Sequence, residues 1–566
     1  MAKISSFDLS ASKLIDLAIE KHRKGDIMGA ARYARDAIGA NKRNGLAYGV
    51  LACLFSDTNE LELANKTLFK GIHVSGEYEN AHYRRQLAIN YLQLDLPDVA
   101  MYYSDEQDVD VLETLDTYFE DEEEAPEPLP ELYLTYPPSR EYCEHLIAKA
   151  FALVHEGDMK GALQIVENLP DDGSDIGTRS KLMLYTLGHD VDAVIDYGER
   201  MIREGKDTVS VRCTLASAYL MKERNEDAYE AARPLLDESN HNLESMFMVL
   251  PVAISLDMHA TVVRIIKTIY EHNRFRGSRR LMLWYAQALY NIGQPEAARA
   301  VMSDANLFFG EDAPAFYYLM MFAEQPENVE YSLTLPREGN VRNMKVLREI
   351  LLSADDELTR FDRSHQAVGD NLEYYVHWAL TNGPEKMQSA VINRILYYKR
   401  AKEIYESSLI SGELDCGIMS EILDALEFLN GGLHPLEFDI VCHERFKHIN
   451  FMLPRALQSL PSVFKRAVQL SVADIVFTDE EPNIYLERLT KLINSIADIS
   501  GDGKVVYSSK LREKLNGVRN ADALVGVFMS KVYEEDETKD SLIERYEINP
   551  KLFDKYFNIV FGDSND

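Results

Sequence analysis

The sequence contains no Cys-x-x-Cys pair and few cysteines of any kind. Its cysteines lie far apart, except that the last two are closer together: Cys53, Cys143, Cys213, Cys416 and Cys442. Closely paired cysteines are typical of structural zinc sites, and evenly numbered sets are typical of disulfide-rich secreted domains. We therefore expect free thiols in a reducing compartment and no metal site.

Long apolar runs are also missing. No stretch approaches the roughly 18 consecutive apolar residues that a membrane-spanning helix needs. The first residues, MAKISSFDLSASKLIDLAIE, lack the basic flank, apolar core and small residues of a secretory signal. We therefore predict a cytoplasmic protein that does not span a membrane.

Basic residues are scarce relative to acidic ones. The 566 residues include 60 Lys and Arg against 93 Asp and Glu, which gives a formal net charge of -33. Nucleic acids and anionic membranes carry the same sign of charge, so non-specific binding to either is disfavoured. A chain of this length exceeds one compact domain, so we expect several domains or an elongated array.

Motifs for catalysis or for a bound cofactor are missing as well. The sequence has no Gly-rich phosphate loop, no G-x-S-x-G nucleophile turn and no pair of carboxylates in a plausible catalytic context. We therefore predict that the protein is not an enzyme and that it binds no cofactor.

Three stretches match functional motifs only in part. In CHERFKH, His443 and His448 are one position too far apart for the HExxH zinc motif, so a partly buried helix is the better interpretation. In DISGDGKVVYSS, Ser509 stands where a calcium loop has its bidentate Glu, which favours a polar turn. In SLIERYEINPKLFDKY, bulky Arg545 and Glu547 stand where a DNA-binding helix-turn-helix prefers Ala and Gly, which favours a core helical hairpin.

A local basic patch interrupts the acidic chain at RFRGSRR. It could bind an acidic peptide or a phosphate, remain a solvated loop, or hold the acidic insert of the same chain. The basic patch consists of Arg274, Arg276, Arg279 and Arg280.

A repeat begins near Ala11. In its first unit, Ala18 and Ala30 are small enough to let two helices cross closely, and Gly25 lies in the turn between them. The next unit returns an alanine, Ala64, at the place that Ala30 has in the first, a step of about 34 residues. Further units align on the same small positions, at Ala52, Ala88, Ala100, Ala150, Ala162, Ala216, Ala228, Ala286 and Ala298.

These units resemble the tetratricopeptide repeat (TPR) family, over residues 11–307. The resemblance implies an all-α fold, a TPR-type solenoid of helical hairpins; a helical array of less regular period is the alternative. We expect TPR-like repeats in residues 1–104 and 139–310, an acidic proline-containing insert at 105–138, and a C-terminal helical domain at 311–566.

The insert is the most acidic part of the chain. From Asp105 to Glu131 it has 13 acidic residues and no Lys or Arg, and prolines follow. Repulsion between like charges predicts an extended segment. It is either a linker, or its few apolar residues fold back onto a groove or dock on a basic partner. In residues 311–566, Leu and Ile recur at helical spacing, so we predict helices that pack on the end of the solenoid.

In the TPR family, fixed positions of each first helix line a concave groove. Chaperone-binding members place Lys and Asn at two of these positions, where the two side chains clamp a terminal carboxylate of the partner. This sequence has Ile15 and Ile19 at those positions, so the clamp is absent from the first repeat. The mostly apolar lining suits an amphipathic helix or an extended apolar peptide, unless these residues pack against neighbouring repeats or the C-terminal domain. The implied groove residues are Ile15, Ile19, His22, His82, Arg85, Ile89, Ile147, Phe151, Arg280, Leu283, Gln287 and Tyr290.

We therefore predict a non-enzymatic scaffold that binds a protein or peptide partner in the groove of its solenoid. The alternative is a peptide-sensing regulatory protein whose C-terminal helical domain acts on nucleic acid. A continuous basic face on residues 341–566 would favour the alternative.

Overall fold

The structure is a computed structural model, and we describe the residues whose positions it defines. These are residues 10–76, 78, 80–105, 107–119, 140–155, 157–169, 176–237, 242–272, 275–310, 313–324, 328–364, 371–430, 436–451, 461–478, 481–496, 517–533 and 537–562. Most of the proline-containing insert, the DISGDGKVVYSS stretch and Arg274 lie outside them.

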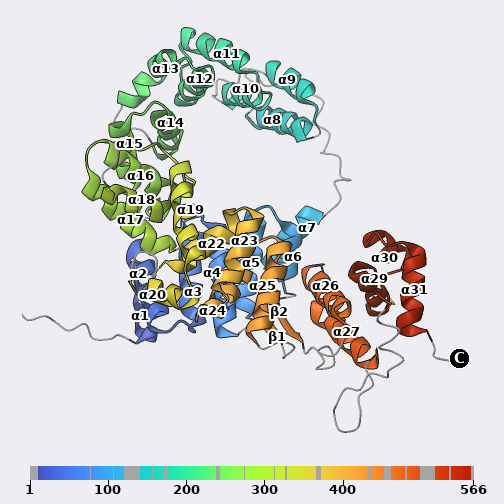
Figure 1. Ribbon diagram of the computed structural model, residues 1–566. Coiled ribbons are helices and arrows are strands. Elements are labelled where there is room, and N and C mark those ends of the chain that lie inside the picture. The colour runs from blue at the N-terminus through green and yellow to red at the C-terminus, as the bar shows by residue number, and fades with distance from the viewer. Residues whose placement is uncertain are drawn as a thin grey trace, which may run out of the picture.

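The N-terminal part of the chain folds into helical hairpins in two blocks. The first block consists of α1 (Ala11–Arg23), α2 (Ile27–Ala40), α3 (Gly45–Asp57), α4 (Leu61–Ser75), α5 (Ala81–Gln93), α6 (Pro97–Tyr103) and α7 (Val109–Phe119). The second block consists of α8 (Arg140–His155), α9 (Met159–Glu167), α10 (Ile176–Leu187), α11 (Val191–Arg203), α12 (Val209–Met221), α13 (Asn225–Asp237), α14 (Leu243–Ser255), α15 (His259–Ile269), α16 (Arg279–Asn291), α17 (Pro295–Phe309) and α18 (Ala313–Glu324). The predicted solenoid of helical hairpins is confirmed (Figure 1).

The small residues of the repeat lie where the hairpin geometry requires them. Because a methyl group is the largest side chain that fits between two closely crossing helices, these positions have no contact with solvent. The residues with an exposure of 0% include Ala18, Ala30, Ala52, Ala64, Ala88, Ala100, Ala150, Ala162, Ala216, Ala228, Ala286 and Ala298.

The turn inside each hairpin adopts a left-handed backbone conformation. Gly25 has φ +74°, and Asn59, one repeat later, has φ +62°. His189, Glu223 and Asp257 take the same conformation in consecutive units, with φ between +50° and +60°. Because a residue with a Cβ atom pays roughly 1–2 kcal/mol for this conformation, the hairpin geometry dominates even where the glycine is lost.

The last hairpin of the second block packs on the first hairpins of the chain. The ring of Phe308 on α17 meets Phe55 of α3 edge to face, with 5.1 Å between ring centroids, and Phe309 stacks on Phe55 at 6.1 Å. On α2, Arg35 donates from Nη2 to the Phe308 carbonyl oxygen at 2.9 Å. The two ends of the repeat region therefore share one apolar core, so the second block forms an arch that rises from α2 (Figure 1).

The C-terminal part consists mainly of helices; its earlier helices lie along the first block, and its last helices lie farther out (Figure 1). Its helices are α19 (Arg337–Leu352), α20 (Asp355–Ser364), α22 (Leu372–Asn382), α23 (Glu385–Ile395), α24 (Ala401–Leu409), α25 (Cys416–Leu429), α26 (Ser462–Thr478), α27 (Pro482–Ile496), α29 (Ala521–Val532), α30 (Lys539–Arg545) and α31 (Pro550–Phe561). The pair α30 and α31 forms the helical hairpin that we expected at SLIERYEINPKLFDKY.

A β-hairpin replaces the helix that we predicted at CHERFKH. Strands β1 (Leu436–Cys442) and β2 (Arg445–Phe451) pair antiparallel, with Cys442 opposite Arg445. His443 and Glu444 form the two-residue turn and have φ +50° and +62°. Two-residue turns with both φ angles positive match the twist of paired strands, which explains the strand geometry.

The acidic insert begins with a helix, although we expected an extended segment. Helix α7 covers Val109–Phe119, and its residues Val111 and Leu115 are 2% exposed in the core beside α5 and α6. Arg85 of α5 binds the acidic residues that precede and begin this helix, with Nε 3.2 Å from Asp108 and Nη2 2.6 Å from Asp110. Local ion pairing and apolar burial therefore offset the like-charge repulsion on which the prediction rested.

Among the described residues, we find no helix that is both long enough and apolar enough to cross a bilayer.

Candidate functional site

A cleft lies between the first block and the C-terminal helices. It has a volume of about 790 Å³ and is lined by α3 and α4 on one side and by α22 and the end of α24 on the other. Its charged lining residues carry both signs and comprise Arg35, Glu60, Glu62, Lys66, Lys70, Arg279, Glu373 and Glu413. A cleft of this size and mixed lining can bury a short peptide segment or a small polar ligand.

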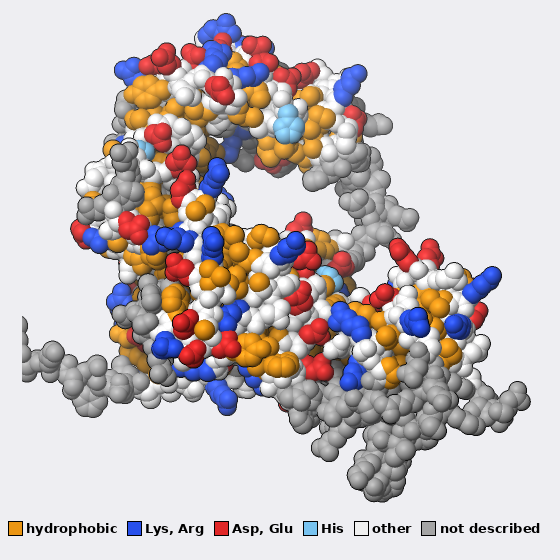
Figure 2. Space-filling view, viewed as in Figure 1, with side chains coloured by type: hydrophobic (Ala, Val, Ile, Leu, Met, Phe, Trp, Pro, Cys, Tyr) orange, Lys and Arg blue, Asp and Glu red, His pale blue; other side chains and the backbone are white. Residues whose placement is uncertain are grey.

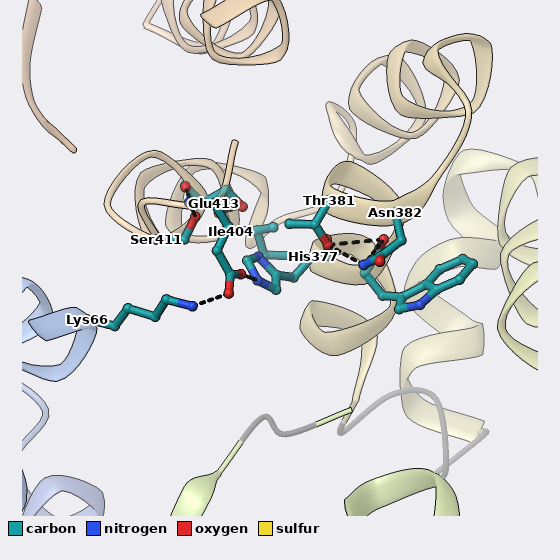
Figure 3. Close-up of polar contacts among 9 residues, drawn as sticks. Lys66, His377, Thr381, Asn382, Ile404, Ser411 and Glu413 are labelled. Carbon is teal, nitrogen blue, oxygen red and sulfur yellow. Dashed lines mark hydrogen bonds and ion pairs between the residues drawn. The ribbon is translucent and has the colours of Figure 1, made fainter. Parts of the chain in front are cut away.

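A three-residue ionic bridge crosses this cleft (Figure 3). Glu413, which follows α24, accepts from Lys66 of α4 at one carboxylate oxygen, and its other oxygen lies 2.5 Å from Nε2 of His377 on α22. The backbone nitrogen of Glu413 also donates to Ser411 Oγ at 3.2 Å. The carboxylate therefore joins the repeats to the C-terminal helices.

The environment of Glu413 keeps its carboxylate ionised. Burial alone would raise the pKa of this group, but the hydrogen bond from His377 and the charge of Lys66 outweigh burial and lower the pKa to about 2. Because both oxygens are engaged, Glu413 is suited to holding two elements together rather than to accepting a proton from a substrate.

Polar side chains of α22 extend the site beyond the bridge (Figure 3). Thr381 donates from Oγ1 to the His377 carbonyl oxygen at 3.0 Å, and Asn382 donates from Nδ2 to Thr381 Oγ1 at 2.7 Å. These bonds orient hydroxyl and amide groups along the cleft wall. The wall therefore offers polar groups as well as charges to a ligand.

A second polar contact joins the β-hairpin to the first block. The carboxylate of Asp439 on β1 lies 2.6 Å from Nδ1 of His73 on α4 and 2.7 Å from Nδ1 of His448 on β2. Tyr78 stacks on the His448 ring with 3.9 Å between centroids. Asp439 is buried, and both of its carboxylate oxygens are hydrogen-bonded to these two imidazoles.

The tip of the β-hairpin inserts among tyrosines of the third repeat unit. Tyr91 donates from its hydroxyl to Glu444 Oε2 at 2.8 Å, and Tyr103 donates to the Glu444 carbonyl oxygen at 2.8 Å. The Phe446 backbone nitrogen in turn donates to the Tyr103 hydroxyl at 2.7 Å. The chain therefore covers this part of its own repeats.

The implied groove residues of the first repeats differ in how far they reach a surface. Ile15 is 3% exposed and packs in the hairpin core, and Ile19 is half-buried in the same cluster. His22 is half-buried and binds Asp57, whereas His82 is exposed.

The other implied groove residues, in both blocks, differ in how far their side chains are exposed to solvent. Ile89 is half-buried against the core that also contains the β-hairpin. Ile147 and Phe151 are half-buried on α8, and Arg280 is exposed and lies over the Trp284 ring at 5.6 Å.

The last groove residues pack near α18 and the crossover, which is the segment that leads from α18 to α19. Gln287 is fully buried and donates from Nε2 to the Ser332 carbonyl oxygen at 2.8 Å. Leu283 is 1% exposed, and Tyr290 stacks on Phe322 at 4.6 Å. These residues therefore face the chain's own segment, an alternative that the sequence left open.

The basic patch lies against the first repeats. The backbone nitrogen of Arg279 donates to Glu60 Oε1 at 2.7 Å, and Arg276 donates from Nε to the Tyr270 carbonyl oxygen at 3.0 Å. An added Cβ at Gly277 would lie 2.5 Å from Thr58, so the backbone approaches α3 closely. Arg279 also lines the cleft, which brings the patch to the same site as Lys66.

The sequence did not predict the cleft, because its walls are far apart in the chain. Lys66 and Glu413 are separated by 347 residues, and each is an ordinary charged residue in its own segment. The β-hairpin was missed for another reason. Alternation of apolar and polar residues around CHERFKH was the one signal that could have indicated strands, but the turn has neither Asn nor Gly to mark it.

Comparisons with known proteins find likenesses among solved structures. No protein-family model matches the chain, and no curated protein matches it. The crystal structure of the P58(IPK) TPR domain at 2.5 Å has 13% sequence identity and covers 74% of this chain and 98% of that chain, with a TM-score of 0.16. That TM-score supports no argument, so the assignment of helical hairpins rests on the structure of this chain itself.

Proposed function

We propose that this protein is a non-enzymatic scaffold of the TPR type that binds a protein or peptide partner on the inner face of its arch. The part of the arch that we assign to the partner comprises the hairpins α8 to α15. Figure 1 shows α8, α10, α12 and α14 on its inner side and α9, α11 and α13 on its outer side. In Figure 2 an opening separates this inner side from the C-terminal helices.

The observation that carries the proposal is a row of exposed apolar side chains on consecutive first helices. Met183 on α10 is 54% exposed, Met221 at the end of α12 is 65% exposed, and Phe247 on α14 is 38% exposed. These three helices lie on the inner side of the arch in Figure 1. Exposed apolar side chains on such helices suit the anchors of an amphipathic helix or an extended peptide, and flexible methionines adapt to either.

The other groove surfaces support this choice of site by contrast. The β-hairpin covers the third repeat unit, and the crossover contacts Gln287 of the last hairpin. The inner face of the arch is therefore the part of the groove that we assign to a partner.

The nucleic-acid alternative has less support. Acidic residues outnumber basic ones in residues 341–566. On the face in Figure 2, blue and red side chains are mixed over α26 to α31 rather than forming one basic surface. Nucleic-acid interfaces need a concentrated positive surface.

The test is affinity capture with the full chain and matched variants. Met183→Glu combined with Phe247→Glu places two charges on helices of the inner side, and we expect the captured partners to be lost. Tyr229→Glu, at a residue that is 36% exposed, places a charge on α13, a helix of the outer side, and should leave capture unchanged. Recovery of the same partners by both variants would show that the inner face is not the binding surface.

A further inference from the structure

Two cysteines and a histidine meet where the β-hairpin turn touches the start of α25. Cys416 is the first residue of α25, Cys442 ends β1, and His443 begins the turn. Their ligand atoms all lie within 4.8 Å of one another. The two Sγ atoms are 4.0 Å apart, and Cys442 Sγ is 3.5 Å from His443 Nδ1.

These distances match the edges of a tetrahedral metal site. With Zn–S bonds of about 2.3 Å and Zn–N bonds of about 2.0 Å, a tetrahedron places two sulfurs about 3.8 Å apart and a sulfur and a nitrogen about 3.5 Å apart. The third pair, Cys416 Sγ and a ring nitrogen of His443, lies within 4.8 Å, and it would have to close to about 3.5 Å for all three atoms to reach one ion. By contrast, a disulfide needs a sulfur–sulfur distance of about 2.05 Å, which is far shorter than the distance between these two thiols.

We propose that Cys416, Cys442 and His443 form a binding site for Zn²⁺, with one coordination position left to solvent. Two thiolates and an imidazole are the ligands that zinc prefers among the common divalent ions. His443 is exposed and Cys416 is half-buried, so an ion can enter from solvent. Cys442 is buried and forms the inner wall of the site.

A bound ion would also fix the contact between the hairpin and the repeats. Glu444 follows His443 directly in the turn and carries the hydrogen bonds to Tyr91 and Tyr103. An ion that ties the turn to α25 would therefore hold Glu444 in position against the third repeat unit. Zinc would stabilise the folded chain by binding it in preference to the unfolded chain.

The test measures metal binding by the full-length chain in a reducing buffer that does not chelate metal. After removal of metal, the chain is titrated with Zn²⁺ against a chromophoric chelator, and with Co²⁺ to record thiolate charge-transfer and tetrahedral visible bands. We expect one ion per chain with both cobalt signatures. Cys416→Ser and His443→Asn should each weaken zinc binding at least tenfold, whereas Cys53→Ser, which alters a half-buried thiol elsewhere, should not.

Each possible result decides the matter. Absence of zinc binding by the wild-type chain, or equal affinity in Cys416→Ser, would overturn the proposal. If Cys442→Ser fails to fold, the two substitutions at the half-buried and exposed ligands still decide, because circular dichroism and the unfolding midpoint report whether those variants are folded.

Discussion

The ionic bridge at Glu413 predicts a specific loss of stability when its charge is removed. Glu413→Gln keeps the shape of the side chain and one hydrogen-bond acceptor. It removes the negative charge of the carboxylate whose two oxygens contact Lys66 and His377. The variant should therefore weaken the contact between the first block and the C-terminal helices without creating a cavity.

The pKa of Glu413 sets the expected magnitude. The difference between an ordinary pKa of 4.5 and the lowered value of about 2 corresponds to at most about 3 kcal/mol. Because the side chain remains 37% exposed, screening by solvent reduces this contribution to about 1 to 2 kcal/mol. We expect Glu413→Gln to lower the free energy of unfolding by that amount at pH 7.

The same pKa fixes the pH dependence. Because the folded-state pKa is lowered, the contribution is fully present above about pH 4.5 and is lost as the pH falls toward about 2. The difference in stability between wild type and Glu413→Gln should therefore shrink across this window.

Urea unfolding followed by circular dichroism between pH 7 and pH 3 measures both effects. Glu487→Gln serves as the control, because Glu487 forms an exposed ion pair with Lys491 within α27 and should leave the midpoint unchanged. A difference between wild type and Glu413→Gln that stays constant with pH, or that equals the difference for the control, would refute the role of the bridge.

Three further substitutions test the packing. Phe308→Ala removes the ring that meets Phe55 and should cost about 3 to 5 kcal/mol in urea unfolding; a cost below about 1 kcal/mol would exclude a shared core. Tyr103→Phe leaves the Phe446 N–H without its acceptor and should cost about 1 to 3 kcal/mol, with faster hydrogen exchange at that amide as the direct readout. Glu223→Gly relieves a left-handed conformation and should raise the thermal midpoint by an amount equivalent to about 0.5 to 1 kcal/mol, whereas an unchanged or lower midpoint would contradict the assigned turn.

Local features of the fold could be predicted from the sequence, because the repeat records them residue by residue. Ala18 and Ala30 mark a helix crossing wherever they occur, and their burial follows from hairpin geometry alone. Even the positive φ at Asn59 follows from its distance to Gly25, although nothing in its own neighbours indicates a turn.

Long-range features could not be predicted, because no periodicity encodes them. The bond between Arg35 and Phe308 spans 273 residues, and the bond between Tyr91 and Glu444 spans 353. The residue type at each of these positions is accounted for by its own helix or turn. A single sequence therefore gives no reason to expect that the two residues are in contact. The cleft and the covered part of the groove depend on these pairings, which is why the sequence identified candidate groove residues but not which of them the chain itself covers.

The packing of α17 on α2 sets an order of events during biosynthesis. At a translation rate of about 5 to 20 residues per second, the 273 residues between Arg35 and Phe308 take about 14 to 55 s to emerge from the ribosome. During that interval the apolar side chains of α2 and α3 that α17 covers in the folded chain, including Phe55, remain exposed to solvent because α17 has not yet been synthesised. Nascent chains of this protein therefore expose an apolar, association-prone N-terminal segment for a long time. In an open array the exposure is much shorter, because each hairpin is covered by the next one to be synthesised.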